Sequence, residues 1–459
     1  MGAETPELET QTAGLLADVA ARATRYLDEI GERRVAPTAE QVSNLDALDT
    51  PLPGGPCDPR DVLAQLDDIG SPATVASAGP RYFGFVTGGA HPAALAAAWL
   101  TAAWDQNAAM AISSPVSARL DAVALRWIVE LLGLPPQTGG GFVTGATMAN
   151  ATCLAAARDA VLTREGWDAA GQGLVGAPPV SVIVGEEVHA TVFKALGLVG
   201  LGRGRARSLP VDDQGRIVAR DLPQVDGPTI VCLQAGNVNS GASDPFEPLI
   251  EWAHEANAWV HVDGAFGLWA AASPSLSEAV RGLHAADSWA TDAHKWLNTT
   301  YDCGVALVRE PDALRESMRA SAAYLPTGDG RSPMDFTPQS SQRARGVECW
   351  ALLRTLGRDG VADLIERCCR LARRFADGLS AAGGEVHNDV VLNQCVVSFG
   401  ERTGEVIAAV QADGTCWAGE TVWRGRRAMR ISVSSWATTD ADIDRSLAAI
   451  VAIVKNVEL

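Results

Sequence analysis

The chain has 459 residues, of which 47% are hydrophobic and 20% are charged, as is usual for a globular protein with a sizeable core. Its formal net charge of −18 argues against binding to nucleic acid or to an anionic membrane surface. No apolar run has the length of about 18 residues that indicates a transmembrane helix.

The nine cysteines and the N-terminus bear on the compartment. The cysteines include no CxxC pair and are odd in number, which favours reduced thiols and gives no pattern of metal ligands. The acidic start of the chain lacks the basic and apolar regions of a secretory signal peptide. We therefore expect a cytoplasmic protein without a bound metal.

The first third of the chain is predicted to be mainly helical. Helical periodicity covers residues 8–31, 91–107 and 117–134, and a connector rich in Pro and Gly (49–59) follows the first of these stretches. We expect residues 1–75 to form an N-terminal helical segment.

Apolar strands and helices then alternate. The predicted strands are 140–145, 180–185, 229–235, 259–265, 288–292 and 303–309. The predicted helices are 147–162, 187–200 and 245–258. This alternation is typical of an α/β fold with a mostly parallel central sheet, which we assign to a large domain at 76–310.

The last part of the chain, 311–459, differs in pattern. Two helices (345–357 and 359–382), a strand (390–400) and a final β–α unit predict a small C-terminal α+β domain. Residues 322–342 contain Pro and Gly without periodicity, which is typical of a mobile loop over a binding site.

The chain has only three lysines, Lys194, Lys295 and Lys455, and it has 34 arginines. An isolated lysine after a strand is ordinarily a surface residue. A lysine amine can also form a Schiff base with a carbonyl, and pyridoxal phosphate is the commonest cofactor that uses this chemistry. Lys295, in "TDAHKW", is the candidate.

Three other residues have the chemistry that such a site needs. Asp263 ends a buried strand and would need a positive partner there, such as a pyridinium. His189 opens a helix, and Thr147 lies in "TGATMAN", where a strand meets a helix and amides can bind phosphate. Each has an ordinary structural explanation alone, but their joint occurrence at strand ends favours a pyridoxal phosphate site.

The same stretches resemble a known family. "HVDGAFG" and "DAHKW", together with "GGFVTGATMANATCLAAAR", "QAGNVNSGASDPF" and "QRARGVECWALLRTLGRDGV", are similar to the group II pyridoxal phosphate-dependent amino-acid decarboxylases. That family includes aromatic-L-amino-acid, histidine and glutamate decarboxylases. The resemblance covers about residues 75–370 and implies fold type I, which is aspartate aminotransferase-like, and a homodimer with sites at its interface.

The resemblance also implies roles for individual residues. Lys295 would form the Schiff base, and Asp263 would pair with the pyridine nitrogen. The other cofactor contacts would be Ala265 and His189 on the two ring faces, Ala146 and Thr147 at the phosphate with His294 nearby, and Asn237 and Asn239 beside the 3′-oxygen. Thr87 would lie near the substrate carboxylate.

Two positions bear on the outcome of the reaction. Tyr324 lies where decarboxylases of the aromatic branch have a loop tyrosine that returns a proton, and relatives with phenylalanine there make aldehydes. This loop usually serves the neighbouring subunit. Asp292 stands where some members have an asparagine that faces the phosphate. A carboxylate there would repel the phosphate, so it must point away or be balanced by a donor.

We therefore expect decarboxylation of an L-amino acid to its amine and CO₂. An aromatic substrate is favoured because Tyr82, Phe83, Phe85 and Trp104 would furnish an apolar pocket and no cationic pocket for a side-chain carboxylate is evident. The alternatives left open are an aldehyde synthase, a decarboxylase of an acidic or diamino acid, a Cα–Cβ lyase, and a protein of this fold without catalysis.

Overall fold

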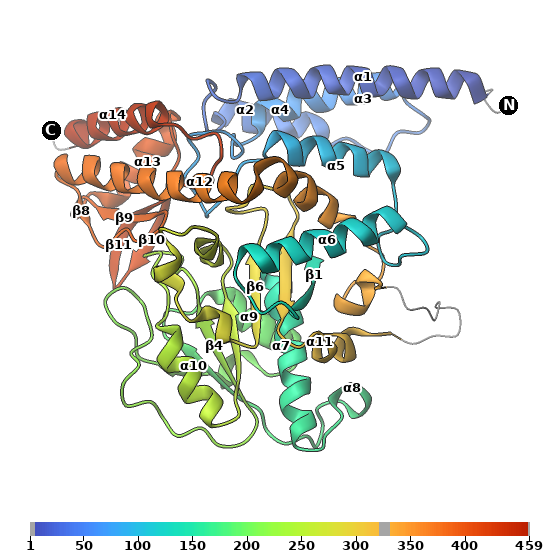
Figure 1. The fold of residues 1–459 in the computed structure, drawn as a ribbon. Coiled ribbons are helices and arrows are strands. Elements are labelled where there is room, and N and C mark those ends of the chain that lie inside the picture. Colours follow the sequence, from blue (N-terminus) through green and yellow to red (C-terminus); the bar gives the residue numbers. More distant parts are fainter. Residues whose placement is uncertain (1–4, 321–330, 458–459) are drawn as a thin grey trace.

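A seven-stranded sheet forms the centre of the molecule (Figure 1). The computed structural model describes residues 5–320 and 331–457. The strands of this sheet are β1 (Gly139–Val143), β2 (Ser181–Gly185), β3 (Arg207–Leu209), β4 (Thr229–Gln234), β5 (Trp259–Asp263), β6 (Ser288–Asp292) and β7 (Gly304–Val308). Their order is β1-β7-β6-β5-β4-β2-β3, and in this sheet β7 runs antiparallel to both neighbours while the other pairs are parallel. The predicted mostly parallel sheet is confirmed.

Helices precede, follow and connect these strands. The α-helices are α1 (Thr5–Glu29), α2 (Ala39–Ser43), α3 (Pro59–Gln65), α4 (Ser71–Ala73), α5 (Pro92–Trp104), α6 (Pro115–Leu131), α7 (Ala146–Arg164), α8 (Ala169–Gln172), α9 (Ala190–Leu198), α10 (Phe246–Glu255), α11 (Pro311–Met318), α12 (Arg345–Ala381), α13 (Thr403–Asp413) and α14 (Asp440–Val457). The predicted break between two long helices is also found, because Gly357 has a φ of 63° inside α12.

Both faces of the large sheet are buried. Val184 and Cys232 pack with α7, α9 and α11 on one face. Ile183 and Val231, which are their neighbours along the strands, pack with α6, α10 and α12 on the other. Because successive strand residues point to opposite faces, burial on both sides requires continuous apolar runs, and such runs are what the sequence contains.

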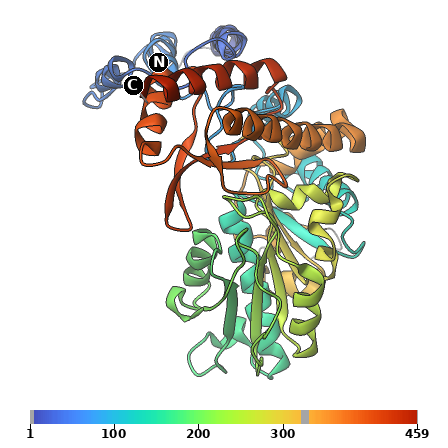
Figure 2. The ribbon, with the colours of Figure 1, turned by 90° about the vertical axis from the view of Figure 1, so that its left-hand side faces the viewer.

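A four-stranded antiparallel sheet lies beyond one end of the large sheet (Figure 2). It consists of β8 (Glu385–Val386), β9 (Gln394–Ser398), β10 (Gly419–Trp423) and β11 (Arg426–Ser432), in the order β10-β11-β9-β8. Together with α13 and α14 it gives the predicted α+β unit. The division of the chain at residues 75 and 310 stays a prediction.

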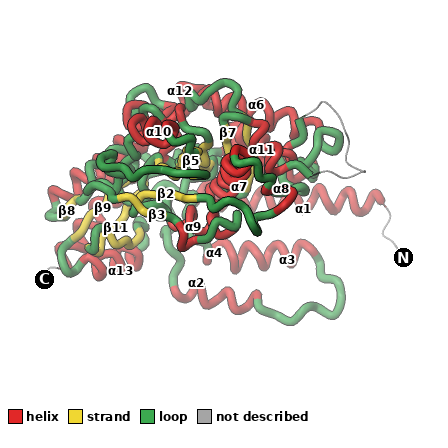
Figure 3. Tube along the Cα trace, turned by 90° about the horizontal axis from the view of Figure 1, so that it is seen from below, coloured by secondary structure: helices red, strands yellow, loops and turns green. Residues whose placement is uncertain are grey.

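The N-terminal helices lie along one side of the molecule. α1 runs across the top of Figure 1, and the segment with α2 and α3 stands away from the rest of the chain in Figure 3. This segment exposes apolar side chains, including Leu45, Leu48 and Leu52. In the described part of the chain, no helix has both the length and the apolar character needed to cross a bilayer.

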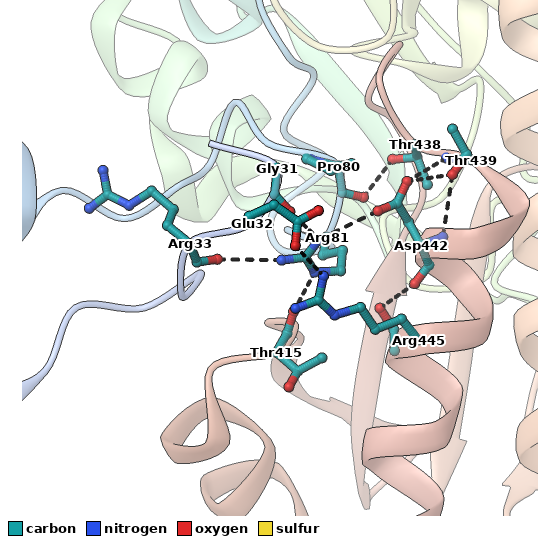
Figure 4. A network of polar contacts seen from close by, with 11 residues as sticks. Gly31, Glu32, Arg33, Pro80, Arg81, Thr415, Thr438, Thr439, Asp442 and Arg445 are labelled. Carbon is teal, nitrogen blue, oxygen red and sulfur yellow. Dashed lines mark hydrogen bonds and ion pairs between the residues drawn. The ribbon is translucent and has the colours of Figure 1, made fainter. Parts of the chain in front are cut away.

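Arg81 joins three distant segments (Figure 4). Its side chain is only 2% exposed. The guanidinium donates to the carbonyl oxygens of Gly31 and, at 2.7 Å, of Thr415, and it lies 3.5 Å from a carboxylate oxygen of Asp442 at the start of α14. Hydrogen bonds from a buried charged donor fix the chain around Arg81. They hold Arg81 between the N-terminal segment and the C-terminal α+β unit.

Candidate active site

A cavity of about 340 Å³ lies where β4, β5 and β6 end. Because the carboxyl ends of parallel strands share one edge of the sheet, the residues that follow them converge there. Most of the predicted site residues line this cavity, namely Ala146, Thr147, His189, Asp263, Ala265, His294 and Lys295. Asp292 lines it as well.

Lys295 lies in a short loop between β6 and β7, and its side chain is 21% exposed. This loop is held by Asn298, whose buried side chain accepts from Gly89 N at 2.8 Å and donates to Trp296 O at 2.8 Å. A Cβ atom at Gly88 would lie 1.9 Å from Lys295 O, so only glycine lets residues 84–89 pass this close. The lysine backbone is thus fixed from both sides, and its amine extends into the cavity, where it pairs with Asp292.

Asp263 is the last residue of β5, and it is 4% exposed. Burial raises the pKa of its carboxyl group, and the nearby charges of His189 and Lys295 oppose that rise. The carboxylate accepts a hydrogen bond from Ala265 N at 3.2 Å. A buried carboxylate at a cavity wall favours a cationic ligand, because a cation lowers the cost of keeping it ionised.

His189 is the N-cap residue of α9. Its Nδ1 accepts from Thr191 N at 3.3 Å and lies 2.7 Å from Thr191 Oγ1, so the ring orientation is set by the helix start. Burial lowers the pKa of His189 and favours a neutral ring. A neutral imidazole fixed in this way offers a flat face to the cavity.

The start of α7 is the candidate anion site. Ala146, Thr147 and Met148 line the cavity, and the first amides of a helix have no acceptor within the helix. Asp292 does not point away, because its Oδ1 accepts from Ala146 N at 2.5 Å. Its Oδ2 lies 3.2 Å from Lys295 Nζ. The donors that the sequence left unnamed are therefore this amide and the lysine.

The two asparagines are engaged elsewhere. Asn237 Oδ1 accepts from Asn239 N at 2.8 Å, and Asn239 Oδ1 accepts from Thr421 Oγ1 at 2.8 Å. In this turn it is Gly236 and Val238 that line the cavity. The side chain of Asn237 thus stabilises this turn, and the side chain of Asn239 connects the turn to β10 in the described structure.

The residues predicted to contact the substrate lie in different environments. Thr87 is 9% exposed and forms a hydrogen bond that opposes the burial-induced rise in the pKa of Tyr301. Phe85 is 63% exposed, with its ring centroid 5.5 Å from that of Trp417. Phe83 does not contribute to a pocket as predicted, because it is buried in the core against Phe375.

The sequence interpretation missed several residues of this region. Gln234 and Phe266 line the cavity, as does Tyr301, whose ring centroid lies 4.3 Å from that of His294. Tyr301 follows Lys295 by six residues in a loop that returns to the cavity, and only its aromatic character would have marked it. Tyr324 lies outside the described residues.

The donor set fits pyridoxal phosphate. The cavity offers an amine for the aldehyde, a buried carboxylate for the ring nitrogen, a flat ring for stacking and helix-start amides for the phosphate. The described residues include no group of three or more His, Cys, Asp or Glu that could hold a metal ion.

Comparison with known proteins agrees with this chemistry. The family model described as the pyridoxal-dependent decarboxylase conserved domain matches residues 44–399. Tryptophan decarboxylase 1 of Oryza sativa is 29% identical over 402 residues, which are 78% of this chain and 77% of that protein. A phenylacetaldehyde synthase of a Rosa hybrid cultivar is 24% identical over 84% of this chain and 83% of its own.

A solved structure supports the fold. The crystal structure of Oryza sativa TDC with PLP and tryptamine superposes with a TM-score of 0.88 at 23% identity and covers 99% of both chains. The predicted fold type I is therefore confirmed. With a family model that spans most of its length, the chain belongs to the pyridoxal-dependent decarboxylases, and its cofactor is pyridoxal phosphate.

Proposed function

We propose that this enzyme decarboxylates an aromatic L-amino acid to the corresponding amine and CO₂. The observation that carries the proposal is the convergence of Lys295, Asp263 and His189 in one cavity of a chain from the decarboxylase family. When bound, pyridoxal phosphate supplies an electron sink for the electron pair that CO₂ leaves behind.

Each of several cavity residues would have its own role in binding the cofactor. Lys295 would hold the cofactor covalently, and Asp263 would keep a proton on the ring nitrogen. His189 would stack on one ring face and Ala265 would contact the other. Thr147 would hold the phosphate with the neighbouring amides of α7. Residues 84–89, packed against the lysine backbone, would help to exclude water.

A buried cation favours a substrate with a carboxylate. Arg430 lies on β11, where burial lowers its pKa and the nearby Tyr82 opposes this effect. Its charge also contributes to the lowered pKa of His189, so the two side chains interact electrostatically. Among the described residues its guanidinium has no ion pair or side-chain hydrogen bond, and it would bind the α-carboxylate.

Aromatic side chains near the cavity favour an aromatic substrate. Tyr301 lines the cavity and forms a side-chain hydrogen bond with Thr87. Phe85 and Tyr82 both contact Trp417. The names of the rice and rose relatives also denote aromatic chemistry. The rose relative keeps aldehyde formation as a second candidate, in which a proton donor such as Tyr324 would be decisive.

A substrate panel tests the proposal. Purified enzyme with pyridoxal phosphate should release CO₂ from one or more aromatic amino acids and form the amine in equal amount, without peroxide. CO₂, amine, ammonia and peroxide are measured for each of the twenty amino acids and for 2,4-diaminobutyrate. Turnover of glutamate or diaminobutyrate alone would contradict the aromatic assignment, and peroxide with ammonia in step with CO₂ would indicate an aldehyde synthase.

We also propose that the enzyme is a cytoplasmic homodimer. Its cysteines are free thiols, as expected in a reducing compartment. Exposed apolar side chains occur on the N-terminal segment and beyond it, at Leu52, Trp99, Leu100 and Ile112. Sedimentation equilibrium should give twice the mass of one chain, and a monomer at micromolar concentration would contradict the dimer.

A further inference from the structure

Asp292 is a carboxylate inside the site that must receive a phosphate. It ends β6 and its side chain is 4% exposed. Oδ1 accepts from Ala146 N at 2.5 Å, and Oδ2 lies 3.2 Å from Lys295 Nζ. The same side chain therefore contacts both an amide at the start of α7 and the amine of Lys295.

The neighbouring histidine does not neutralise this charge fully. His294 Nδ1 accepts from Cys303 N at 3.0 Å, so in the neutral ring the proton is on Nε2. That Nε2 lies 3.5 Å from Asp292 Oδ1. Burial lowers the pKa of His294, which favours the neutral ring. The charge of Asp292 is thus balanced mainly by Lys295 and by the dipole of α7.

We propose that Asp292 is an internal anion that occupies the phosphate-binding end of α7 in the cofactor-free protein and lowers the affinity for phosphorylated cofactor. The carboxylate accepts the hydrogen bond of the Ala146 amide, and it also pairs with Lys295. Lys295 must leave this ion pair before its amine can bind the aldehyde. The amides of Thr147 and Met148, which line the cavity, would hold a phosphate dianion beside this second negative charge.

This proposal concerns the cofactor of the family and is independent of the aromatic substrate. Removal of the charge should favour the phosphorylated aldehyde specifically. Pyridoxal has the same ring and aldehyde but no phosphate, so any effect of Asp292 on Lys295 applies to both ligands. The ratio of the two dissociation constants therefore isolates the interaction with phosphate.

The test uses the cofactor-free protein and its Asp292→Asn variant, which keeps an acceptor oxygen for Ala146 N. Pyridoxal phosphate and pyridoxal are titrated by absorbance. We expect the ratio of the pyridoxal constant to the pyridoxal phosphate constant to rise about tenfold in the variant, as loss of one close charge–charge contact implies. Inorganic phosphate should also raise the thermal midpoint of the variant more than that of the wild type.

Asp287→Asn is the matched control. Asp287 precedes β6 at its opposite end, where it accepts from Val260 N at 2.7 Å, so the control removes the same charge far from the cavity. Its ratio should equal that of the wild type. Asp292→Ser, also neutral and polar, should behave like Asp292→Asn and guards against a folding defect. An unchanged or lower ratio in both Asp292 variants would overturn the proposal.

Discussion

Lys295→Ala should abolish decarboxylation, with a fall of at least about 10⁴-fold in kcat, because no other described cavity residue has an amine. Covalent attachment of pyridoxal phosphate should be lost with it. Borohydride reduction followed by peptide mass spectrometry should find the cofactor on Lys295 in the wild type and on no peptide in the variant.

Lys194→Ala is the control for this prediction. Lys194 is an exposed residue of α9, so its loss changes the lysine content by the same amount without altering the cavity. Activity and labelling should remain at wild-type level. Circular dichroism should show that Lys295→Ala is folded, although Asp292 loses its ion-pair partner. Labelling of Lys194 or Lys455 in the Lys295→Ala protein would refute the assignment.

Periodicity predicted the large sheet well, because both of its faces are covered. A strand such as β5 is buried at every position, and its run "WVHVD" stands out against the helices around it. The order of the strands did not follow from the sequence. β1 pairs with β7, which is far along the chain, and only tertiary packing sets that pairing.

The hairpin of the small sheet was missed because its turn carries only part of the usual sequence signal. β10 and β11 are joined by Arg424 and Gly425, with φ values of 49° and 79°. Left-handed conformations at both central residues fit a tight hairpin turn, which sequences usually mark with Asn-Gly or Asp-Gly. Arg424 does not carry that mark. β10 was therefore left out of the predicted strands.

The residues around the cavity were likewise predicted only in part. Residues that end a strand or start a helix, such as Asp263 and His189, could be found because the sheet edge is implied by the strand pattern. Asn237 and Asn239 lie in a turn beside the cavity, but the side chain of Asn237 bonds within the turn and that of Asn239 bonds Thr421 on β10, and a motif does not encode side-chain direction. Arg430 comes from the other sheet, so its position depends on how the two sheets pack.

Asp263→Asn should lower kcat/KM by about 10³-fold, which is the scale of losing one preorganised electrostatic group. Asparagine has the same shape but cannot hold a proton on the ring nitrogen by charge. The decrease should appear with every substrate that the enzyme turns over, because the carboxylate acts on the cofactor. Steady-state kinetics at saturating pyridoxal phosphate measure it.

The same substitution should not weaken the cofactor-free protein. Burial raises the pKa of Asp263 above its usual value, so the folded state binds this proton more tightly than the unfolded chain. The carboxylate therefore costs stability as pH rises from the unfolded pKa through the folded pKa. In mildly alkaline buffer the neutral asparagine side chain avoids this cost, and the thermal midpoint of the cofactor-free variant should equal or exceed that of the wild type.

A lower kcat/KM together with an equal or higher thermal midpoint would distinguish a functional carboxylate from a structural one. Asp287→Asn should show the reverse pattern, with activity retained and a midpoint that is unchanged or lower, since Asp287 bonds Val260 N and His254. A large loss of stability in cofactor-free Asp263→Asn would mean that Asp263 chiefly supports the fold. Retention of full activity would mean that another group protonates the ring nitrogen. With activity lost and stability kept, the carboxylate is maintained at a cost to folding because the cofactor needs its charge.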